Sequence, residues 1–299
     1  MDTGRRRRIG LPLGQLLVLP ALLMMVLFIL LPIVWGIVVS FTDMSLVGPR
    51  AMKLDFVGLK NYLKLLKDPD FFNSLRVSFL FTVFSALIGQ AFLGLFLAIL
   101  MRQKELKGKT LAALAVFVSW VIPEVVAGYM WGVYASRKGL LSMLLATLGL
   151  GHRNLLITNP LETIIVANIW RGTAFSMILF TAALESIPNY IYEAAQVDGA
   201  SAYQRFRYIT FPLVSRALLI DFILITIWTF SVFTMVFVMT GGGPGGQTEL
   251  WTIFAYRRSL QPPYEVGYAV ASTNLMALLV LALVILYMKM LGRVGVSAQ

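Results

Sequence analysis

Residues 16–40 read LLVLPALLMMVLFILLPIVWGIVVS, an apolar run without a charged side chain. A transmembrane α-helix needs about 20 predominantly apolar residues to cross the hydrocarbon core of a bilayer. The basic head MDTGRRRRIG precedes this run, as it does in a signal peptide. A signal peptide, however, has an apolar region of only about 7–15 residues and then a small-residue cleavage site. We therefore expect a retained first transmembrane helix.

Five further stretches of the chain pass the same length test. The predicted spans cover residues 16–40, 75–101, 110–134, 161–184, 213–239 and 267–291. The composition agrees, because 59% of the residues are hydrophobic and only 13% are charged, against about 25% charged in a typical soluble domain. The chain is thus predicted to be an all-α, polytopic membrane protein that forms a single domain over residues 1–299.

The positive charge of the chain bears on topology. A net charge of +11 would suggest nucleic-acid binding in a soluble chain, but in a membrane protein basic residues mark cytoplasmic edges and meet anionic lipid. Six spans place both termini on one side. The tail Arg5–Arg8 and the short loop 102–109, with one arginine and three lysines, predict that this side is cytoplasmic. The outer loop 41–74 carries five basic residues, which runs against the rule.

Several kinds of chemistry lack the residues they need. The chain has no cysteine, which excludes disulfides, thiolate metal sites and cysteine nucleophiles. Its one histidine, His152, lies in a polar stretch without nearby carboxylates, so no metal site is predicted. A membrane-embedded enzyme would need clustered carboxylates or histidines at one membrane face, and the sequence shows none.

The glycine-rich stretch GGGPGGQT, residues 241–248, invites comparison with a phosphate-binding loop. Such a loop reads G-x-x-x-x-G-K-[ST], follows a strand and opens a helix. Gly241, Gly246 and Thr248 fit, but Gln247 stands in place of the lysine that meets phosphate charge. An apolar span precedes the stretch, and Pro244 interrupts it. We therefore expect no nucleotide site in this chain.

The segment 185–213, ESIPNYIYEAAQVDGASAYQRFRYITFPL, connects the fourth and fifth predicted spans. Ser186 and Pro188 are typical of a helix start, and NYIYEAAQV has good helix formers. Asp198-Gly199 predicts the end of that helix, because glycine adopts the left-handed cap conformation at little cost. A second helical stretch follows, and Pro212 is expected near the start of the next span. By physics alone, the first helix is either an ordinary connection or a docking surface of small side chains and carboxylates.

This segment resembles the EAA loop of binding-protein-dependent ABC importer permeases. In that family, E-A-A is followed by a glycine four residues after the second alanine, and then by a hydrophobic residue and a proline. The matching residues here, with Asp198 beside the glycine, are Glu193, Ala194, Ala195, Gly199, Ile209 and Pro212. Phe211 replaces the usual leucine before the proline. The resemblance implies that these residues form the coupling segment that docks into the ATPase subunit.

Two other stretches are similar to the MalF-type sugar permeases of this family, namely FVGLKNYLKLLKDPDFFNSLR at 56–76 and TGGGPGGQTELWTIFAYRRSL at 240–260. The resemblance implies a type I importer permease fold in the bacterial plasma membrane, carrying a sugar such as a maltose- or trehalose-like disaccharide. It also implies a second, MalG-like permease, two ATPase subunits that bind ATP and Mg²⁺, and an external solute-binding protein. The chain itself would bind no cofactor. The residues expected to face the binding protein are Gly241, Gly242, Gly243 and Pro244.

Buried ionisable groups and aromatic side chains suggest the substrate pathway. Glu124, Arg171 and Asp221 lie inside predicted spans, where a charge is costly and marks either function or pairing within the bundle. Sugar faces stack on aromatic rings such as Trp120 and Trp228, and sugar hydroxyls need polar partners such as Asn168. The residues selected for the pathway are Glu124, Trp228, Ser231, Thr234 and Asn274. Packing and interface anchoring are the alternative roles for such aromatics.

Two alternative functions stay open at this point. A glycerol-phosphate importer would need a cationic lining, for which Arg171 is the one candidate. A self-sufficient secondary transporter usually has inverted repeats and broken helices near the midplane, and it would leave the segment 185–212 without a role.

Overall fold

The computed structural model describes residues 13–49, 51–103 and 107–296. Within those residues the chain is helical, and extended pairing is limited to isolated bridges such as Thr42 with Phe56. Arg5–Arg8 and Lys104, on which the charge argument partly depends, lie outside the described residues. The α-helices are α1 (Leu13–Met25), α2 (Leu31–Ser40), α3 (Lys60–Leu65), α4 (Pro69–Phe81), α5 (Ala91–Met101), α6 (Lys109–Val121), α7 (Glu124–Ala135), α8 (Leu140–Thr147), α9 (Leu155–Thr158), α10 (Pro160–Glu185), α11 (Asn189–Val197), α12 (Ala202–Arg205), α13 (Phe211–Phe230), α14 (Thr234–Thr240), α15 (Trp251–Leu260) and α16 (Val266–Val296). Three π-helical turns join consecutive helices: η1 (Val26–Leu30), η2 (Thr82–Gln90) and η3 (Phe206–Thr210).

Five continuous helices in the described residues are long and apolar enough to cross a membrane. They are Leu17–Ser40, Pro69–Met101, Pro160–Glu185, Ala202–Phe230 and Val266–Gly292. A bent pair, Lys109–Val121 with Glu124–Thr147, brings the number of crossings to six if it is counted as one span. The first, second, fourth and sixth predicted spans thus correspond to unbroken helices, whereas the third and fifth differ.

The third span, expected over 110–134 as one helix, is broken in the structure. Helix α6 ends at Val121, α7 begins at Glu124, and the two helices are bent by 106°. Proline disfavours the helical conformation in the residue before it, and Ile122, before Pro123, has an extended ψ of 129°. The break therefore has a local cause in the sequence Ile122-Pro123.

The fifth span, expected over 213–239, is displaced toward the N-terminus. A continuous helix runs from Ala202 to Phe230, after which the chain leaves the helix and forms the separate α14. A capping box between Ser201 and Gln204 starts this helix early. Pro212, expected near the start of the span, lies inside the helix directly after η3. Proline removes one i→i−4 hydrogen bond from a helix, and the π-helical turn η3 just before Pro212 departs from that hydrogen-bonding pattern.

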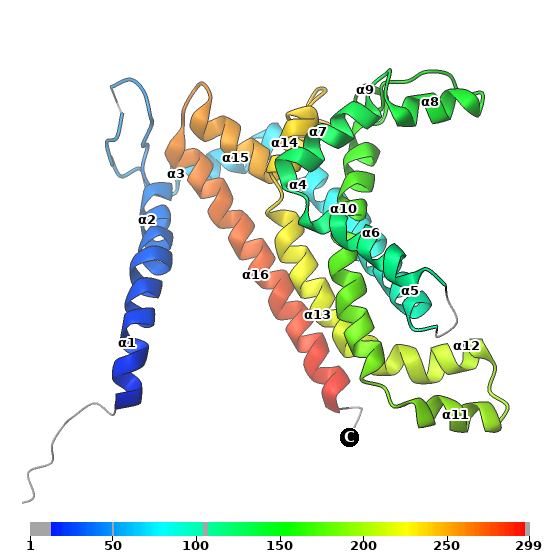
Figure 1. The fold of residues 1–299 in the computed structure, drawn as a ribbon. Helices are drawn as coiled ribbons and strands as arrows, with labels where there is room; N and C mark the ends of the chain where they lie inside the picture. Colours follow the sequence, from blue (N-terminus) through cyan, green and yellow to red (C-terminus); the bar gives the residue numbers. More distant parts are fainter. Residues whose placement is uncertain (1–12, 50, 104–106, 297–299) are drawn as a thin grey trace, which may run out of the picture.

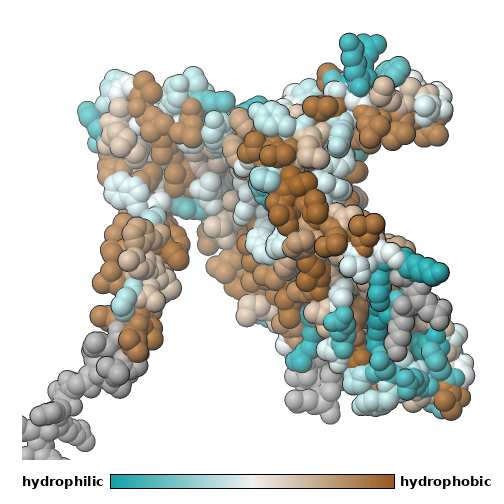
Figure 2. Space-filling model, in the orientation of Figure 1, coloured by the Kyte–Doolittle hydropathy of each residue, from teal (hydrophilic) through white to brown (hydrophobic). Residues whose placement is uncertain are grey.

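The connections gather at two opposite ends of the bundle (Figure 1). One end, which we call the α11 side, holds α11, α12, the α5–α6 connection and the end of α16, and α1 starts there. The other, the α14 side, holds α3, α8, α9, α14 and α15. Hydrophobic residues cover much of the surface between the two ends, while hydrophilic residues gather over α8–α9 and over α11–α12 (Figure 2). This distribution is the one expected of a bundle that crosses a bilayer.

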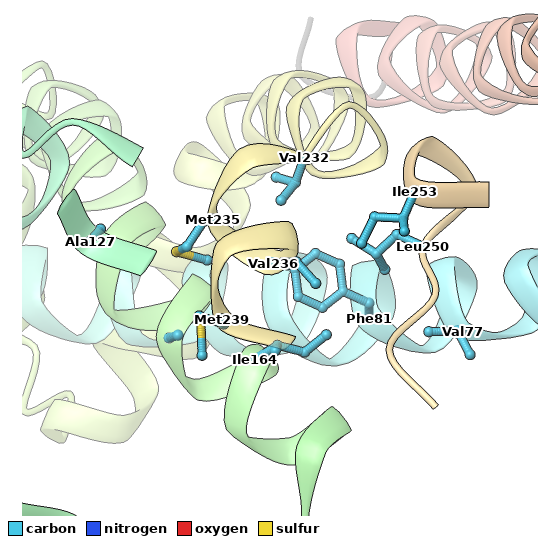
Figure 3. Packing of buried hydrophobic residues seen from close by; sticks show 11 residues of the cluster. Val77, Phe81, Ala127, Ile164, Val232, Met235, Val236, Met239, Leu250 and Ile253 are labelled. Atoms are coloured by element: carbon cyan, nitrogen blue, oxygen red, sulfur yellow. The ribbon is translucent and has the colours of Figure 1, made fainter. Parts of the chain in front are cut away.

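The largest cluster of buried side chains holds α14 in place. It joins α4, α7, α10, α14 and α15, and Phe81 lies against Val236 near its centre (Figure 3). Phe81 and Val236 are fully buried. The cluster consists of Val77, Phe81, Ala127, Ile164, Ala167, Val232, Met235, Val236, Met239, Leu250 and Ile253. The short helix after the fifth span is therefore a packed element of the α14 side, which fixes where the chain breaks at residues 231–233.

Candidate functional site

A cavity of about 320 Å³ lies where the two broken spans meet the end of η2 and the middle of α10. Glu124 comes directly after the break in the third span, and Ser231 and Val232 lie in the break after α13. Gln90 comes from the end of η2, and Asn168 to Phe175 come from the middle of α10. The lining residues are Gln90, Trp120, Glu124, Asn168, Arg171, Gly172, Phe175, Ile225, Trp228, Thr229, Ser231 and Val232. The break in the third span and the break after α13 thus both contribute residues to this cavity.

The cavity contains one ion pair. Nη1 of Arg171 lies 3.3 Å from Oε1 of Glu124, and the two side chains are 22% and 35% exposed. Glu124 occupies the first turn of α7, where the helix dipole favours a negative charge. The Nε atom of Arg171 is buried without a hydrogen-bond partner. Since Nε is buried, the exposed part of the Arg171 side chain is made up of its other atoms.

Amide side chains form the floor of the cavity. Nε2 of Gln90 donates to the main-chain oxygen of Asn168 at 3.1 Å, and Nδ2 of Asn168 donates to Oγ of Ser85 at 2.8 Å. A Cβ atom at Gly172 would collide with the Gln90 side chain, so a glycine is needed there for Gln90 to reach α10. These contacts hold the amide groups in fixed orientations, as a site that recognises hydroxyl groups requires.

Three aromatic rings form one wall. The Phe175 and Trp228 rings meet edge to face with centroids 4.6 Å apart, and Trp120 lies 6.2 Å from Phe175. Trp120 and Trp228 remain 37% and 45% exposed. Partly exposed indole faces beside fixed amides offer both the apolar and the polar contacts that small-molecule sites combine.

The residues predicted for the substrate pathway are only partly brought together. Glu124, Trp228 and Ser231 line the cavity, but Thr234 and Asn274 do not. Thr234 falls beyond the break, on α14, and Asn274 lies on α16 with its Nδ2 buried and unpartnered. If residues 213–239 formed one helix, as predicted, Thr234 would lie on the same face as Ser231, about one turn further along the helix. Gln90 was not selected, although it is an amide within an otherwise apolar stretch, which was the available signal.

Asp221, the third ionisable group considered, lies away from the cavity. Its side chain is fully buried on α13. Both carboxylate oxygens accept from Oγ of Ser176, on α10, at 3.0 Å. In the structure this carboxylate therefore joins α10 to α13, which is the pairing within the bundle considered as an alternative from the sequence.

The segment 185–212 forms two helices separated by a glycine turn. Helix α11 follows Pro188 and ends at Val197, and Gly199 adopts a left-handed φ of +77°. The side chain of Ser201 then accepts from the Gln204 main chain, and the Gln204 side chain accepts from Ser201 in return. The helix end predicted at Asp198-Gly199 and the second helix after it are both present.

The first half of α11 is fastened to the bundle. The guanidinium of Arg102 donates to the Ile187 main-chain oxygen at 3.3 Å and to Oδ1 of Asn189 at 3.2 Å. Arg102 also lies over the Tyr192 ring at 4.3 Å, and the Tyr192 hydroxyl contacts Oγ1 of Thr210 at 3.0 Å. These contacts tie α11 to the α5–α6 turn and to the base of the fifth span. The first half of α11 is therefore joined to both of these elements.

The other half of α11 has no such contact with the described residues and is mostly exposed. Glu193, Ala194, Asp198 and Gly199 are exposed, and Val197 is 89% exposed. Within the rest of the predicted coupling set, Pro212 is exposed, whereas Ala195 and Ile209 are half-buried. An exposed valine flanked by small side chains and two carboxylates is suited to close packing against another protein surface.

The glycine loop on the α14 side is closed by its own hydrogen bonds. Thr248 is fully buried and donates to the Gly243 main-chain oxygen at 2.7 Å, and Arg257 donates to the Gly241 oxygen at 2.6 Å. Gly241, Gly242, Gly245 and Gly246 adopt left-handed φ values. Such values favour glycine, which accounts for the composition of the loop without a bound phosphate.

Within the predicted binding-protein-facing residues of this loop, exposure varies. Pro244 is exposed and Gly241 and Gly243 are half-buried, whereas Gly242 is buried against Ile253 of α15. Nearby, Arg257 pairs with Glu249 at 3.0 Å. Burial raises the pKa of Glu249 above its ordinary value, and the charge of Arg257 acts in the opposite direction. The exposed residues of the loop are thus Pro244, Gly245 and Gln247.

Comparison with known proteins gives a consistent result. A family model described as "Binding-protein-dependent transport system inner membrane component" matches residues 90–294. The trehalose/maltose transport system permease protein MalF of Thermococcus litoralis is 34% identical over 281 residues, which cover 93% of this chain and 92% of that protein. The lactose transport system permease protein LacF of Rhizobium radiobacter is 30% identical, covering 90% and 91%. A chain of a bacterial alginate ABC transporter, solved in complex with an alginate pentasaccharide-bound periplasmic protein, superimposes with a TM-score of 0.80 at 21% identity, covering 94% of each chain.

Proposed function

The chain belongs to the family of binding-protein-dependent transport system inner membrane components, and from that premise we propose that it carries a sugar of the maltose or trehalose kind. The all-helical type I importer permease fold predicted from the sequence is confirmed. The chain is a permease subunit of an ABC importer, in which a separate subunit hydrolyses ATP. It resides in the membrane as a multi-pass protein.

One observation supports the proposal for the cargo above the others. The cavity combines the exposed faces of Trp120 and Trp228 with the fixed amides of Gln90 and Asn168, and it lies between the two broken spans. Stacking on a ring and hydrogen bonding to hydroxyl groups are the two contacts that a sugar offers. We assign Glu124, Trp228 and Ser231 to the pathway on this basis, and add Gln90 and Arg171.

The second part of the proposal concerns energy coupling. The exposed half of α11, with Glu193, Ala194, Asp198 and Gly199, docks on a separate ATPase that binds ATP and Mg²⁺. Closure of the ATPases pushes α11, and the Arg102 and Tyr192 contacts carry the movement to the α5–α6 turn and to α13. Spans that rock as rigid bodies then expose the cavity to one side and then to the other.

The remaining partners and the orientation follow from the same proposal. A second, MalG-like permease completes the pathway, two ATPases bind on the α11 side, and a loaded solute-binding protein docks on the α14 side near Pro244. The α11 side, and with it both termini, is cytoplasmic. Among the described residues, Arg102, Lys107 and Lys109 at the α5–α6 turn support this orientation.

A glycerol-phosphate importer is the alternative, and the cavity gives it little support. Phosphate recognition favours uncompensated cationic donors, whereas Arg171 is paired with Glu124. A self-sufficient secondary transporter would gain support from the broken spans, but it leaves the exposed half of α11 without a partner.

Uptake by the assembled importer separates the two kinds of cargo. In vesicles that contain this chain, its partner permease, the ATPases and ATP, with the binding protein on the outside, we expect accumulation of radiolabelled maltose or trehalose. Radiolabelled glycerol phosphate should not accumulate above the level seen without the binding protein. Accumulation of glycerol phosphate and of neither disaccharide would contradict the assignment.

A further inference from the structure

Glu124 and Arg171 are the charged residues among those that line the cavity, one of each sign. They meet through a single contact of 3.3 Å between Nη1 and Oε1. Both side chains remain partly exposed, at 35% and 22%. The pair therefore lies in the cavity wall as a neutral unit, with both charged ends accessible to a bound molecule.

Arg171 makes fewer hydrogen bonds with the described residues than its guanidinium group allows. A guanidinium group has five N–H donors and pairs best with a carboxylate or phosphate through two parallel hydrogen bonds. Here the Nε atom is buried without a partner, and the contact with Glu124 involves one terminal nitrogen. Without the negative charge of Glu124, Arg171 would be an uncompensated cation in the cavity wall, because no other charged residue lines the described cavity.

The glutamate end is held in place independently of the arginine. Glu124 follows Pro123 at the start of α7, and the break in the third span fixes this position. The N-terminus of α7 favours its negative charge. An anionic ligand that approaches Arg171 therefore meets a second negative charge close by, and like charges in a partly desolvated site repel strongly.

We propose that Glu124 sets the charge class of the cargo: by neutralising Arg171, it makes the cavity accept uncharged sugars and reject sugars that carry a carboxylate. Hydroxyl groups donate to the carboxylate and accept from the guanidinium, so an uncharged sugar uses both ends of the pair without leaving either charge unpaired. This inference rests on the proposed function and adds a specificity residue to it. It assigns the discrimination to the permease itself, in addition to any selection by the binding protein.

Direct binding to the full chain tests this without the binding protein. The chain is placed in lipid nanodiscs, and the dissociation constants of maltotriose and of trigalacturonate are measured by equilibrium dialysis with labelled sugars. Tryptophan fluorescence gives a second readout, because Trp120 and Trp228 line the cavity. In the wild-type chain, maltotriose should bind more tightly than trigalacturonate.

The variant Glu124→Gln keeps the shape and removes the charge. We expect it to shift the ratio of the two dissociation constants toward trigalacturonate by at least about tenfold, because a like-charge repulsion is lost and a cation becomes free. Glu162→Gln is the matched control, since Glu162 is an exposed residue in the first turn of α10 and does not line the cavity. It should leave the ratio unchanged.

The variant Arg171→Gln distinguishes an effect of charge from damage to the fold. It should shift the ratio the opposite way, further from trigalacturonate, because it leaves Glu124 unpaired. Two shifts of opposite sign cannot come from a general loss of packing. Suppose that the wild type binds maltotriose and that Glu124→Gln gives the same ratio of dissociation constants as the Glu162→Gln control. That result overturns the inference about Glu124 without contradicting the sugar function. Binding of neither sugar by the wild type contradicts the sugar function as well.

Discussion

Replacement of Gly199 by tryptophan is expected to lower sugar uptake per ATP hydrolysed on the order of tenfold, while sugar binding to the cavity stays near the wild-type level. Gly199 lies between α11 and α12 with φ +77°, and among the described residues beyond its chain neighbours no atom lies within 4 Å of the position of an added Cβ. A bulky side chain there projects from the surface on which the ATPase is proposed to dock. Loss of that contact removes the coupling free energy between the ATPase and the cavity. Coupling free energies between two sites usually correspond to changes in affinity of about 5–150-fold.

The control for this experiment is Gly149→Trp. Gly149 follows the C-cap residue of α8 on the α14 side, at the opposite end of the bundle (Figure 1), with φ +81°, and among the described residues beyond its chain neighbours no atom lies within 4 Å of an added Cβ. The two variants therefore share the backbone strain of a left-handed residue, about 1–2 kcal/mol, and differ in whether they lie on the coupling surface. Uptake and ATP hydrolysis are measured in the same vesicles. A wild-type ratio of uptake to hydrolysis in Gly199→Trp would contradict the coupling role.

The second large effect concerns stability. In Gly94→Leu, the added Cβ would lie 2.5 Å from Cβ of Ser176 and 2.9 Å from the main-chain nitrogen of Met177, so α5 and α10 must separate. The same Ser176 holds the buried Asp221. Overpacking of this kind costs about 1–3 kcal/mol or more. We expect the midpoint of thermal unfolding in detergent to fall by roughly 5–10 °C, taking about 2–4 °C per kcal/mol.

Gly132→Leu is the matched control for Gly94→Leu. Gly132 also lies within a helix, α7, and no atom lies within 4 Å of its added Cβ. Both changes gain the same helix propensity, about 1 kcal/mol relative to glycine, so the difference between them isolates the helix contact. Unfolding midpoints that agree within error would show that α5 and α10 do not require close approach at Gly94.

The helices, including the two in the segment 185–212, were predictable because their signals are local. Runs of apolar residues give the crossings directly, and Asp198-Gly199 ends α11 through the backbone freedom of a single glycine. The departure of the glycine loop from a phosphate-binding pattern is equally local, since Gln247 and Pro244 lie within the pattern itself. In each case the residues that decide the structure lie within a few positions of one another.

The cavity was less predictable because it depends on where helices stop and on what meets across the bundle. The break at Ile122-Pro123 could be expected from the proline. The size of the bend, 106°, which brings Glu124 to Arg171, could not be expected from the sequence. The end of the fifth helix at Phe230 depends on the cluster around Val236, assembled from five separate helices. Thr234 lies on α14 outside the cavity for that reason, and Gln90 reaches the cavity only because Gly172 on another helix has no side chain.

The most direct test of the account is whether transport by this chain depends on an ATPase. The sugar that accumulates best in the complete importer is offered to vesicles that contain both permeases and the binding protein, with or without the ATPase subunits and ATP. We predict accumulation only when the ATPases and ATP are both present. Accumulation in vesicles that contain this chain without any ATPase would contradict the assignment of the exposed half of α11 as the route by which energy enters.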